Sequence, residues 1–142
     1  MEGVTITRAS TSDLPTILPL VREFYEIDGH HYDEAFVTAA LEPLLADDRY
    51  GQVWLFDSGY AVLTWGYSLE SGGRDALLDE LFVRNRGGGV GGAVLRALVD
   101  QARKAGARKM FLETEAPNDA ARRFYGRHGF EAETSTWLSQ VL

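Results

Sequence analysis

The sequence predicts an α/β domain of the α+β type, with a mixed, mostly antiparallel sheet of six to seven strands flanked by about four helices. Two observations support this class. Short apolar runs bounded by turn residues alternate with longer segments in which apolar residues recur at every third or fourth position. The chain has 142 residues, of which 45% are hydrophobic, so it can build one core but not two ordinary domains. We therefore expect residues 1–142 to form a single domain.

The N-terminal third predicts a strand and two helices. Residues 4–9 alternate apolar and polar side chains like an edge strand. A first helix is expected from the turn that contains Pro15 to about Ile27. Its apolar residues recur at helical spacing and are Leu14, Ile17, Leu18, Val21, Phe24 and Tyr25. Residues 28–31 break the pattern, and a second helix is expected from about Asp33 to Ala46.

The middle of the chain predicts an antiparallel meander. Val53 to Phe56 and Tyr60 to Ser68 are expected to pair through Asp57-Ser58-Gly59, and Leu77 to Val83 continues the sheet. The rest of the chain predicts a helix, a strand, a second helix and two short strands, at about residues 90–105, 109–114, 118–128, 130–134 and 136–141.

The composition argues against several classes of site and partner. The chain has no cysteine, and therefore no disulfide framework, thiolate metal site or cysteine nucleophile. A formal net charge of −7 argues against nucleic acid, which is bound through clustered Lys and Arg. No stretch approaches the roughly 20 apolar residues of a membrane span, and no leader pattern is seen, so we expect no membrane partner and a cytoplasmic location. His30 and His31 are adjacent, and adjacent residues seldom converge on one ion, so no metal site is expected.

The most informative segment is glycine-rich and runs from Arg86 to Gly92. It follows the apolar run Leu81-Phe82-Val83 and opens the helix expected from Val90. Glycines let the backbone approach a ligand without obstruction by a Cβ atom. The first N–H groups of a helix lack partners within the helix and carry the positive end of its dipole. The segment therefore predicts an anion site, and a pyrophosphate is the natural occupant.

Two patterns share these glycines, and they predict different cofactors. Gly87, Gly89 and Gly92 fit G-x-G-x-x-G, the dinucleotide pattern. That pattern belongs in the first βα unit of a parallel sheet, with an acid about 20 residues further on. Here the loop begins past the middle of the chain, and Glu113 and Glu115 are poorly placed for a ribose. A nicotinamide cofactor is therefore the less favoured interpretation.

The other pattern is Arg/Gln-x-x-Gly-x-Gly/Ala, which Arg86, Gly89 and Gly91 satisfy. Downstream, residues 118–125 followed by Gly129-Phe130 fit N-x-x-A-x-x-F-Y…G-F. With both motifs in this order, the chain resembles the GCN5-related N-acetyltransferase (GNAT) superfamily, in which the first motif is the coenzyme A loop. The resemblance implies a GNAT acyl-CoA N-acyltransferase fold, acetyl-CoA (coenzyme A) as cosubstrate and acetyl transfer to a primary amine.

The resemblance covers residues 76–131 by motif and the whole chain by the order of its elements. Asp79-Glu80-Leu81-Phe82-Val83 is similar to the family's fourth strand. The turns after Val83 and near Asp57 are shorter than the family norm. By resemblance, the residues that bind the cosubstrate are Leu81, Phe82, Val83, Arg86, Gly87, Gly88, Gly89, Val90, Gly91, Gly92, Asn118 and Tyr125.

Acetyl transfer requires a base, because a primary amine with a pKa near ~10.4 arrives protonated at neutral pH. Asp79 and Glu80 are the candidates on the predicted fourth strand. Adjacent strand residues point to opposite faces, so one of the two is expected to face the substrate, and we slightly favour Glu80. Glu80 could instead be an exposed carboxylate or an ion-pair partner of Arg74 or Arg84. Glu70 and Asp75 are alternative bases in the loop expected before that strand.

The leaving thiolate requires an acid, and the resemblance implies Tyr125, whose alternative role is that of a core aromatic. Asn118 is implied to contact the pantetheine arm and is also placed to cap the last helix. The sequence says less about the acceptor substrate. We expect a small-molecule amine such as a polyamine, amino acid or aminoglycoside, and after it a peptide N-terminus or lysine. A noncatalytic acyl-CoA-binding or regulatory module is the alternative from another class, and the resemblance is also compatible with a homodimer.

The resemblance places the acceptor site under the two N-terminal helices and the loop between them. Two central strands contribute a face that could border the same pocket. The candidate substrate-binding residues are Tyr25, His30, Tyr32, Trp65, Tyr67 and Glu70.

Overall fold

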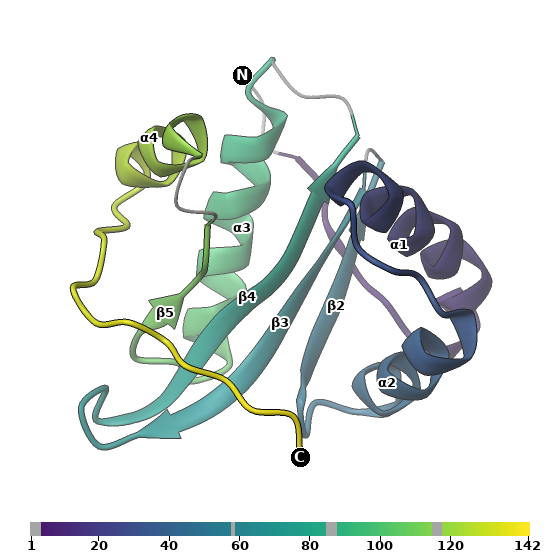
Figure 1. Cartoon of the computed structure of the whole chain (residues 1–142), viewed down its shortest axis with the longest axis horizontal. Coiled ribbons are helices and arrows are strands. Elements are labelled where there is room, and N and C mark those ends of the chain that lie inside the picture. Colours follow the sequence, from purple (N-terminus) through teal and green to yellow (C-terminus); the bar gives the residue numbers. More distant parts are fainter. Residues whose placement is uncertain (1–3, 58, 85–87, 115–117) are drawn as a thin grey trace.

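The protein is represented by a computed structural model, which describes residues 4–57, 59–84, 88–114 and 118–142. In these residues one sheet of five strands lies between two layers of helices (Figure 1), which confirms the predicted α+β class. The elements are β1 (Thr7–Arg8), a 3-10 turn (Thr11–Asp13), α1 (Leu14–Asp28), α2 (Glu34–Ala46), β2 (Gly51–Phe56), β3 (Gly59–Ser68), β4 (Gly73–Val83), α3 (Val90–Lys104), β5 (Met110–Phe111) and α4 (Asp119–Arg127).

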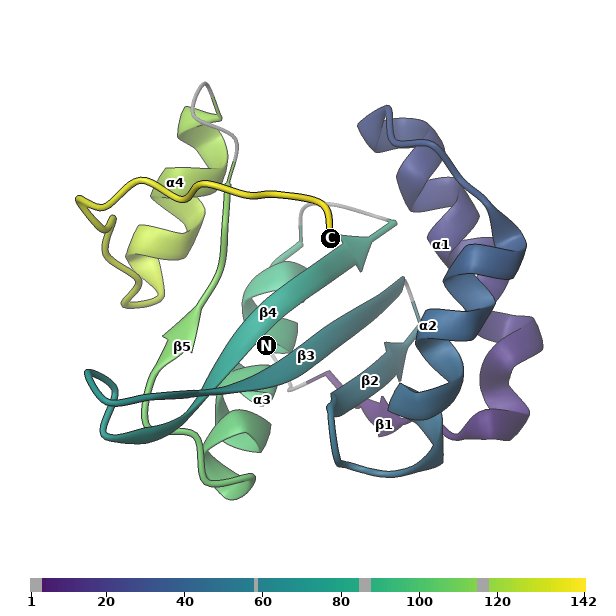
Figure 2. The ribbon, with the colours of Figure 1, turned by 60° about the horizontal axis from the view of Figure 1, so that its bottom comes forward.

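The sheet has the order β1-β2-β3-β4-β5, and its first four strands are antiparallel. The predicted pairing of the strands on either side of Asp57 is confirmed, and it extends to Phe56 and Gly59. β5 is parallel to β4 and pairs with it only at Ala76–Met110 and Leu77–Phe111. Beyond these pairs β4 continues to Val83 while the chain after β5 moves away from it (Figure 2).

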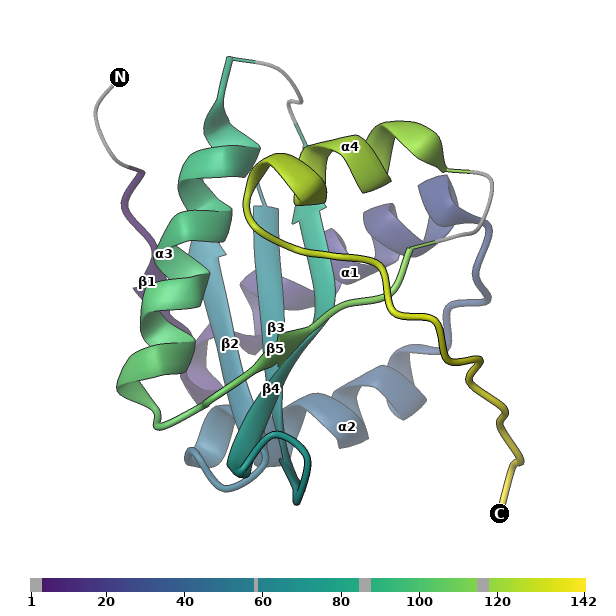
Figure 3. The same cartoon turned by 90° about the vertical axis from the view of Figure 1, so that its left-hand side faces the viewer.

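Each face of the sheet buries its own apolar cluster. On one face α1 and α2 pack on β2, β3 and β4, with Ile17, Tyr60 and Phe82 among the buried residues. On the other face α3 packs through Val94, Leu95 and Leu98. Figure 3 shows the strands between α3 and the N-terminal helices. The apolar residues at helical spacing in α1 and α2 therefore pack on one face of the sheet, and those of α3 pack on the other.

The expected C-terminal strands at residues 130–134 and 136–141 are wrong. Residues 131–142 are all exposed and carry no strand, and Trp137 is 80% exposed. The physical reason is that β5, the nearest strand along the chain, is only two residues long and offers these segments almost no edge to pair with. The described part of the sheet accordingly has five strands, fewer than the six to seven predicted.

Burial in the α3 layer generates a stability prediction. Leu98 is fully buried at the centre of α3, so Leu98→Ala is expected to lower the free energy of unfolding by about 2–5 kcal/mol through lost apolar contact and a cavity. Leu138→Ala makes the same chemical change at a residue 91% exposed, and the expected change is within about 0.5 kcal/mol. Urea denaturation of both variants measures the difference, and equal losses would contradict the described packing.

Candidate functional site

A β-bulge in β4 is the local feature on which the candidate site is built. Val62 of β3 pairs with Glu80, and its neighbour Leu63 pairs with Leu78, so Asp79 is an extra residue in β4. A regular strand would place Leu78 and Glu80 on one face. Instead Leu78 belongs to the cluster under α3, while Glu80 lies on the face covered by α1. The period-two alternation expected of a strand therefore fails at this point.

Two tyrosine hydroxyls hold the Glu80 carboxylate. Tyr25 Oη, from α1, donates to Glu80 Oε2 at 2.6 Å, and Tyr60 Oη, from β3, donates to Glu80 Oε1 at 2.6 Å. Both are short hydrogen bonds to an anionic acceptor, which are stronger than neutral ones. The alternative partners considered for Glu80 are engaged elsewhere, because Arg84 pairs with Glu23 at 2.8 Å and Arg74 donates to the Ala105 carbonyl at 3.2 Å.

Burial and neighbouring groups set the protonation of this cluster. Burial raises the pKa of the Glu80 carboxyl, the two tyrosine hydrogen bonds lower it, and the charge of Asp79 raises it again, with a net upward shift. Partial shielding from water raises the pKa of Asp79. Burial, followed by the interaction with Glu80, moves the pKa of Tyr25 and of Tyr60 well above the ordinary value. Both phenols therefore stay protonated at neutral pH and act as donors.

The loop between α1 and α2 lies beside this cluster. The Tyr25 ring makes edge contacts with His30 and with Tyr32, at centroid distances of 5.9 and 6.2 Å. His30 is exposed, and its Nε2 lies 2.8 Å from an oxygen of Asp28. The structure thus brings three predicted acceptor-side residues together with Glu80, through Tyr25. Apart from His30, the polar side chains of this group are acidic or phenolic.

Glycines open α3 at the same end of the sheet as Glu80. Gly88 and Gly89 are exposed, with φ of 68° and 80°, a region that favours glycine. Gly89 is the N-cap of α3, so the first N–H groups of that helix follow it directly. Arg86 and Gly87, also predicted to bind the cosubstrate, lie outside the described residues.

Gly91 and Gly92 face α4. A Cβ at Gly91 would lie 3.5 Å from the Phe124 ring, and one at Gly92 would lie 3.0 Å from the His128 ring. These glycines permit α4 to pack closely on the first turn of α3. Val90, the remaining residue of the predicted loop, is partly buried against the α3-side cluster.

The two motif residues of α4 lie at its start and in its second half. Asn118 is the N-cap, and its Oδ1 accepts a hydrogen bond from the Ala121 N–H at 3.0 Å, which confirms the predicted capping role. Tyr125 is partly buried, with ring contacts to Phe124 at 5.1 Å and to Phe130 at 5.9 Å. It packs with the cluster on the α3 face of the sheet.

Glu80 and Tyr125 therefore belong to opposite faces of the sheet. A ligand that contacts both must pass the edge of β4 beyond Leu77, where pairing with β5 has ended. This edge includes the three residues Leu81, Phe82 and Val83, of which Phe82 and Val83 are buried and Leu81 is partly buried. Their side chains pack into the two clusters, so their contribution to a ligand site would come from the backbone.

Three other predicted acceptor residues lie towards the opposite end of the β3–β4 hairpin. Trp65 and Tyr67 are three and five residues along β3 from Val62, the partner of Glu80, which corresponds to about 10 and 17 Å. Glu70 is in the turn beyond them, at the bottom of Figure 1. The Trp65 indole donates to the Asp48 carbonyl at 2.9 Å, and Tyr67 is 82% exposed. The structure does not bring these residues to Glu80.

Tyr60 is the member of the Glu80 cluster that the sequence pattern does not reveal. Its aromatic side chain follows Gly59 in an apolar strand, and nothing in the local pattern distinguishes it from a core residue. It is indeed fully buried, yet its hydroxyl reaches Glu80, 20 residues away in the chain. A buried tyrosine usually finds a hydrogen-bond partner, and that rule is the signal that could have found it.

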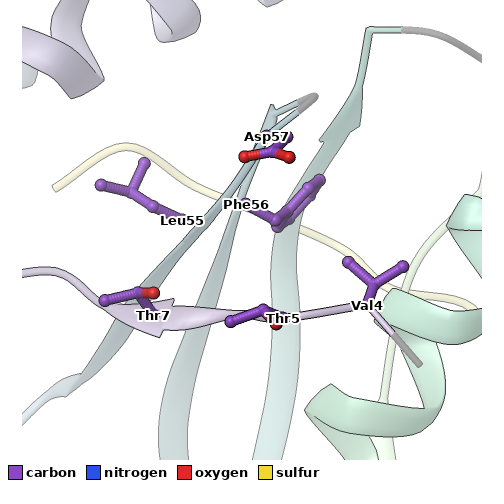
Figure 4. A pocket seen from close by; sticks show the side chains of 6 residues that line it. All are labelled: Val4, Thr5, Thr7, Leu55, Phe56 and Asp57. Atoms are coloured by element: carbon purple, nitrogen blue, oxygen red, sulfur yellow. The ribbon is translucent and has the colours of Figure 1, made fainter. Parts of the chain in front are cut away.

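A surface pocket lies elsewhere. A cavity of about 480 Å³ is lined by Val4, Thr5, Thr7, Leu55, Phe56 and Asp57, beside β1 and the end of β2 (Figure 4). It is at the opposite edge of the sheet from β5 and has a single charged lining residue, Asp57. The lining of this pocket therefore provides few groups for acid–base chemistry or for binding an ion.

Metal ligands and membrane spans are both lacking from the part of the chain that the structure describes. No three His, Asp or Glu side chains there lie together in a way that could hold a metal ion. Within the same residues, no helix has both the length and the apolar character needed to cross a bilayer.

Comparisons with known proteins agree on one family. The profile of the Acetyltransferase (GNAT) family matches residues 15–130. The chain is 33% identical to a protein of Bacillus subtilis (strain 168) named Uncharacterized N-acetyltransferase YhfO, over 92% of each chain.

Solved structures have the same fold. The integron cassette protein HFX_CASS3, from the mobile metagenome of Cole Harbour Salt Marsh, is 32% identical with a TM-score of 0.84, over 96% of this chain and 90% of that one. An aminoglycoside acetyltransferase, meta-AAC0020 from an uncultured soil metagenomic sample, was solved in complex with sisomicin. It is 19% identical with a TM-score of 0.78, over 98% of this chain and 96% of that one, a likeness that shows the fold alone.

The hydroxyl pair at Glu80 generates a spectroscopic prediction. Because burial raises the pKa of Tyr60 far above its ordinary value, its phenol is expected to stay protonated in the folded protein at the pH where exposed tyrosines ionise. Tyr60→Phe should therefore leave the tyrosinate absorbance of the native protein in that range unchanged. In guanidinium chloride the same variant should lose the signal of one of six tyrosines. An equal loss in native and denatured protein would show that Tyr60 is not held as described.

Proposed function

The chain belongs to the GNAT acetyltransferase family, and from this premise we propose that it transfers an acetyl group from acetyl-CoA directly to a primary amine of a small molecule. The observation that carries the proposal is the meeting of three features at one end of β4. These are the tyrosine-held Glu80, the glycine-opened start of α3, and the β4 edge left free by β5.

The start of α3 fits the pyrophosphate of acetyl-CoA. Gly88 and Gly89 adopt left-handed backbone conformations, and neither places a side chain of its own before the first N–H groups of α3. Arg86, which the family pattern assigns beside the pyrophosphate, would add a positive charge there. Along Leu81 to Val83, the free strand edge offers N–H and C=O groups to the pantetheine amides, in the manner of an added strand.

Glu80 is proposed as the base that accepts the acceptor's proton. A carboxylate has about four lone-pair sites, and the two tyrosines use one on each oxygen, so each oxygen retains a site for a proton or a bridging water. The net upward shift of the Glu80 pKa makes it a better proton acceptor than an ordinary glutamate. Asp79 is the second candidate, since the bulge places it next to Glu80.

Tyr125 is proposed as the acid. Acetyl-CoA supplies a reactive thioester, and the reaction forms the N–C bond of the amide and breaks the C–S bond. Glu80 takes one proton from the arriving ammonium. The nitrogen loses a second proton on becoming the amide, and that proton passes through solvent to Tyr125, which has given its own to the leaving sulfur. A phenol, whose ordinary pKa is near ~10, is a reasonable donor to a thiolate whose acid has a pKa near ~8.5.

The acceptor is proposed to be a cationic small amine. Asp28, Asp79 and Glu80 lie around the α1 side of the site, and the chain as a whole carries a net charge of −7, so a cation is drawn towards it. Polyamines, amino acids and aminoglycosides meet this description, and the structural relative solved with sisomicin is an example of the fold binding such a ligand. A peptide or protein amine is the second candidate. A cytoplasmic location and a homodimer stay predictions.

Binding of acetyl-CoA is the first test. Isothermal titration should give a dissociation constant in the micromolar range for acetyl-CoA and no heat for NAD. Gly88→Ala should weaken acetyl-CoA binding at least several-fold, because a side chain at positive φ strains the loop and obstructs the ligand. Gly106→Ala is the matched control, since Gly106 also has positive φ and open space around it but lies beyond the far end of α3.

The outcomes separate the two glycine patterns and the noncatalytic alternative. NAD binding in place of acetyl-CoA would overturn the proposal and restore the dinucleotide interpretation. Acetyl-CoA binding without release of coenzyme A across a screen of polyamines, amino acids, aminoglycosides and peptides would favour a binding module over an enzyme.

Turnover is expected to depend on the Tyr125 hydroxyl. Tyr125→Phe should lower kcat by about 100-fold or more, because general-acid assistance is lost, while acetyl-CoA binding measured by calorimetry is retained. Tyr50→Phe removes a hydroxyl from an exposed side chain outside the site and should leave kcat unchanged. Equal kcat values for the two variants would show that the Tyr125 hydroxyl is not the acid.

A further inference from the structure

We propose that Tyr25 and Tyr60 are positioning residues for Glu80, which fix its carboxylate at the β4 bulge and keep it ionised for proton transfer. This inference rests on the proposed role of Glu80 as the base. It goes beyond that role in giving one predicted acceptor residue, Tyr25, a different task and in adding Tyr60, which the sequence did not suggest.

The carboxylate is held from two independent elements. Tyr25 comes from helix α1 and Tyr60 from strand β3, and each donates to a different oxygen of Glu80 at 2.6 Å. With both oxygens fixed, rotation of the carboxylate about its last side-chain bond would break two short hydrogen bonds. The oxygens therefore keep one orientation relative to the backbone edge of β4, and the remaining lone pairs point in fixed directions.

The Tyr60 ring is itself held rigidly. It is fully buried and makes edge contacts with Phe24 and Phe82, each at a centroid distance of 6.2 Å. Phe24 and Phe82 stack on one another at 5.4 Å. Such packing leaves the phenol few alternative positions, so its hydroxyl is a stationary donor. A core aromatic without this function could be phenylalanine.

Tyr25 differs in exposure and surroundings. It is partly buried, and its ring touches His30 and Tyr32 in the loop that precedes α2. The same side chain therefore contacts both Glu80 and the loop proposed to border the acceptor. Displacement of this loop by a bound amine would act on Glu80 through Tyr25, while Tyr60 keeps the other oxygen in place.

The charges that face Glu80 oppose one another. Asp79, its neighbour at the bulge, disfavours the ionised form, as does burial, whereas the two hydroxyls and the charge of His30 favour it. Removing one hydroxyl leaves the penalties of burial and Asp79 and deletes a favourable contact. The Glu80 pKa should therefore rise, so that the base is ionised only at higher pH.

The test is the pH profile of kcat/KM for Tyr60→Phe. The acidic limb, which reports ionisation of the base in the free enzyme, should move to higher pH by about one unit, so kcat/KM at pH values below the limb should fall about tenfold. KM for acetyl-CoA and the calorimetric dissociation constant should be unchanged, because the phenol does not face the α3 start. A merely structural role would lower the melting temperature without moving the pH limb. Tyr50→Phe is the control hydroxyl deletion.

Two companion variants make the outcomes distinguishable. Glu80→Gln should abolish most turnover, and if it does not, the base is misassigned and this inference falls with it. If Glu80→Gln is inactive but Tyr60→Phe has the pH profile and kcat of the wild type, the base stands and the positioning role is overturned. Should Tyr60→Phe fold poorly, Tyr25→Phe removes the other donor from a partly exposed residue and must show the same shift of the acidic limb.

Discussion

The site depends on one local constraint, the extra residue that β4 accommodates opposite β3. Between Leu78 and Glu80 the strand changes the face to which its alternating side chains point, because Asp79 has no counterpart on β3. Leu78 can then remain in the cluster under α3 while Glu80 turns towards α1. Burying a carboxylate in that layer costs free energy unless hydrogen-bond donors contact it. The tyrosines of α1 and β3 meet this requirement, so the position of the helix, the register of the hairpin and the charge of the site are mutually dependent.

The second organising feature is the early end of β4–β5 pairing. A parallel strand pair normally continues until one strand turns away, and here it stops after Leu77. The edge beyond that point belongs to the same stretch of β4 that carries the bulge, and α3 begins shortly after it. Groups suited to a pyrophosphate, to amides and to an amine therefore occur in order along one short segment of chain. In the proposed reaction Glu80 and Tyr125, which belong to opposite faces of the sheet, would act on one ligand across this open edge.

Much of this arrangement can be predicted from the sequence, and the exceptions have physical causes. The four long helices, the central hairpins and the cap at Asn118 follow from local periodicity and capping chemistry, which depend on neighbouring residues. The strand position of Glu80 favours it as the base, but its partners cannot be found in the same way, because Tyr25 and Tyr60 are 55 and 20 residues away. The bulge at Asp79 also cannot be predicted from the alternation of apolar and polar residues, since that alternation assumes a regular strand. The C-terminal strands are expected from local pattern alone, although a strand forms only against a partner.

The single extra residue at Asp79 has a consequence for changes in chain length. A strand without it would still place Leu78 and Glu80 on opposite faces, since they would then be sequential neighbours. Deletion of Asp79 would therefore preserve the face to which the carboxylate points while restoring the regular pairing of the strand. The hairpin can thus tolerate a shorter β4 at this position without losing the contact between Glu80 and the two tyrosines.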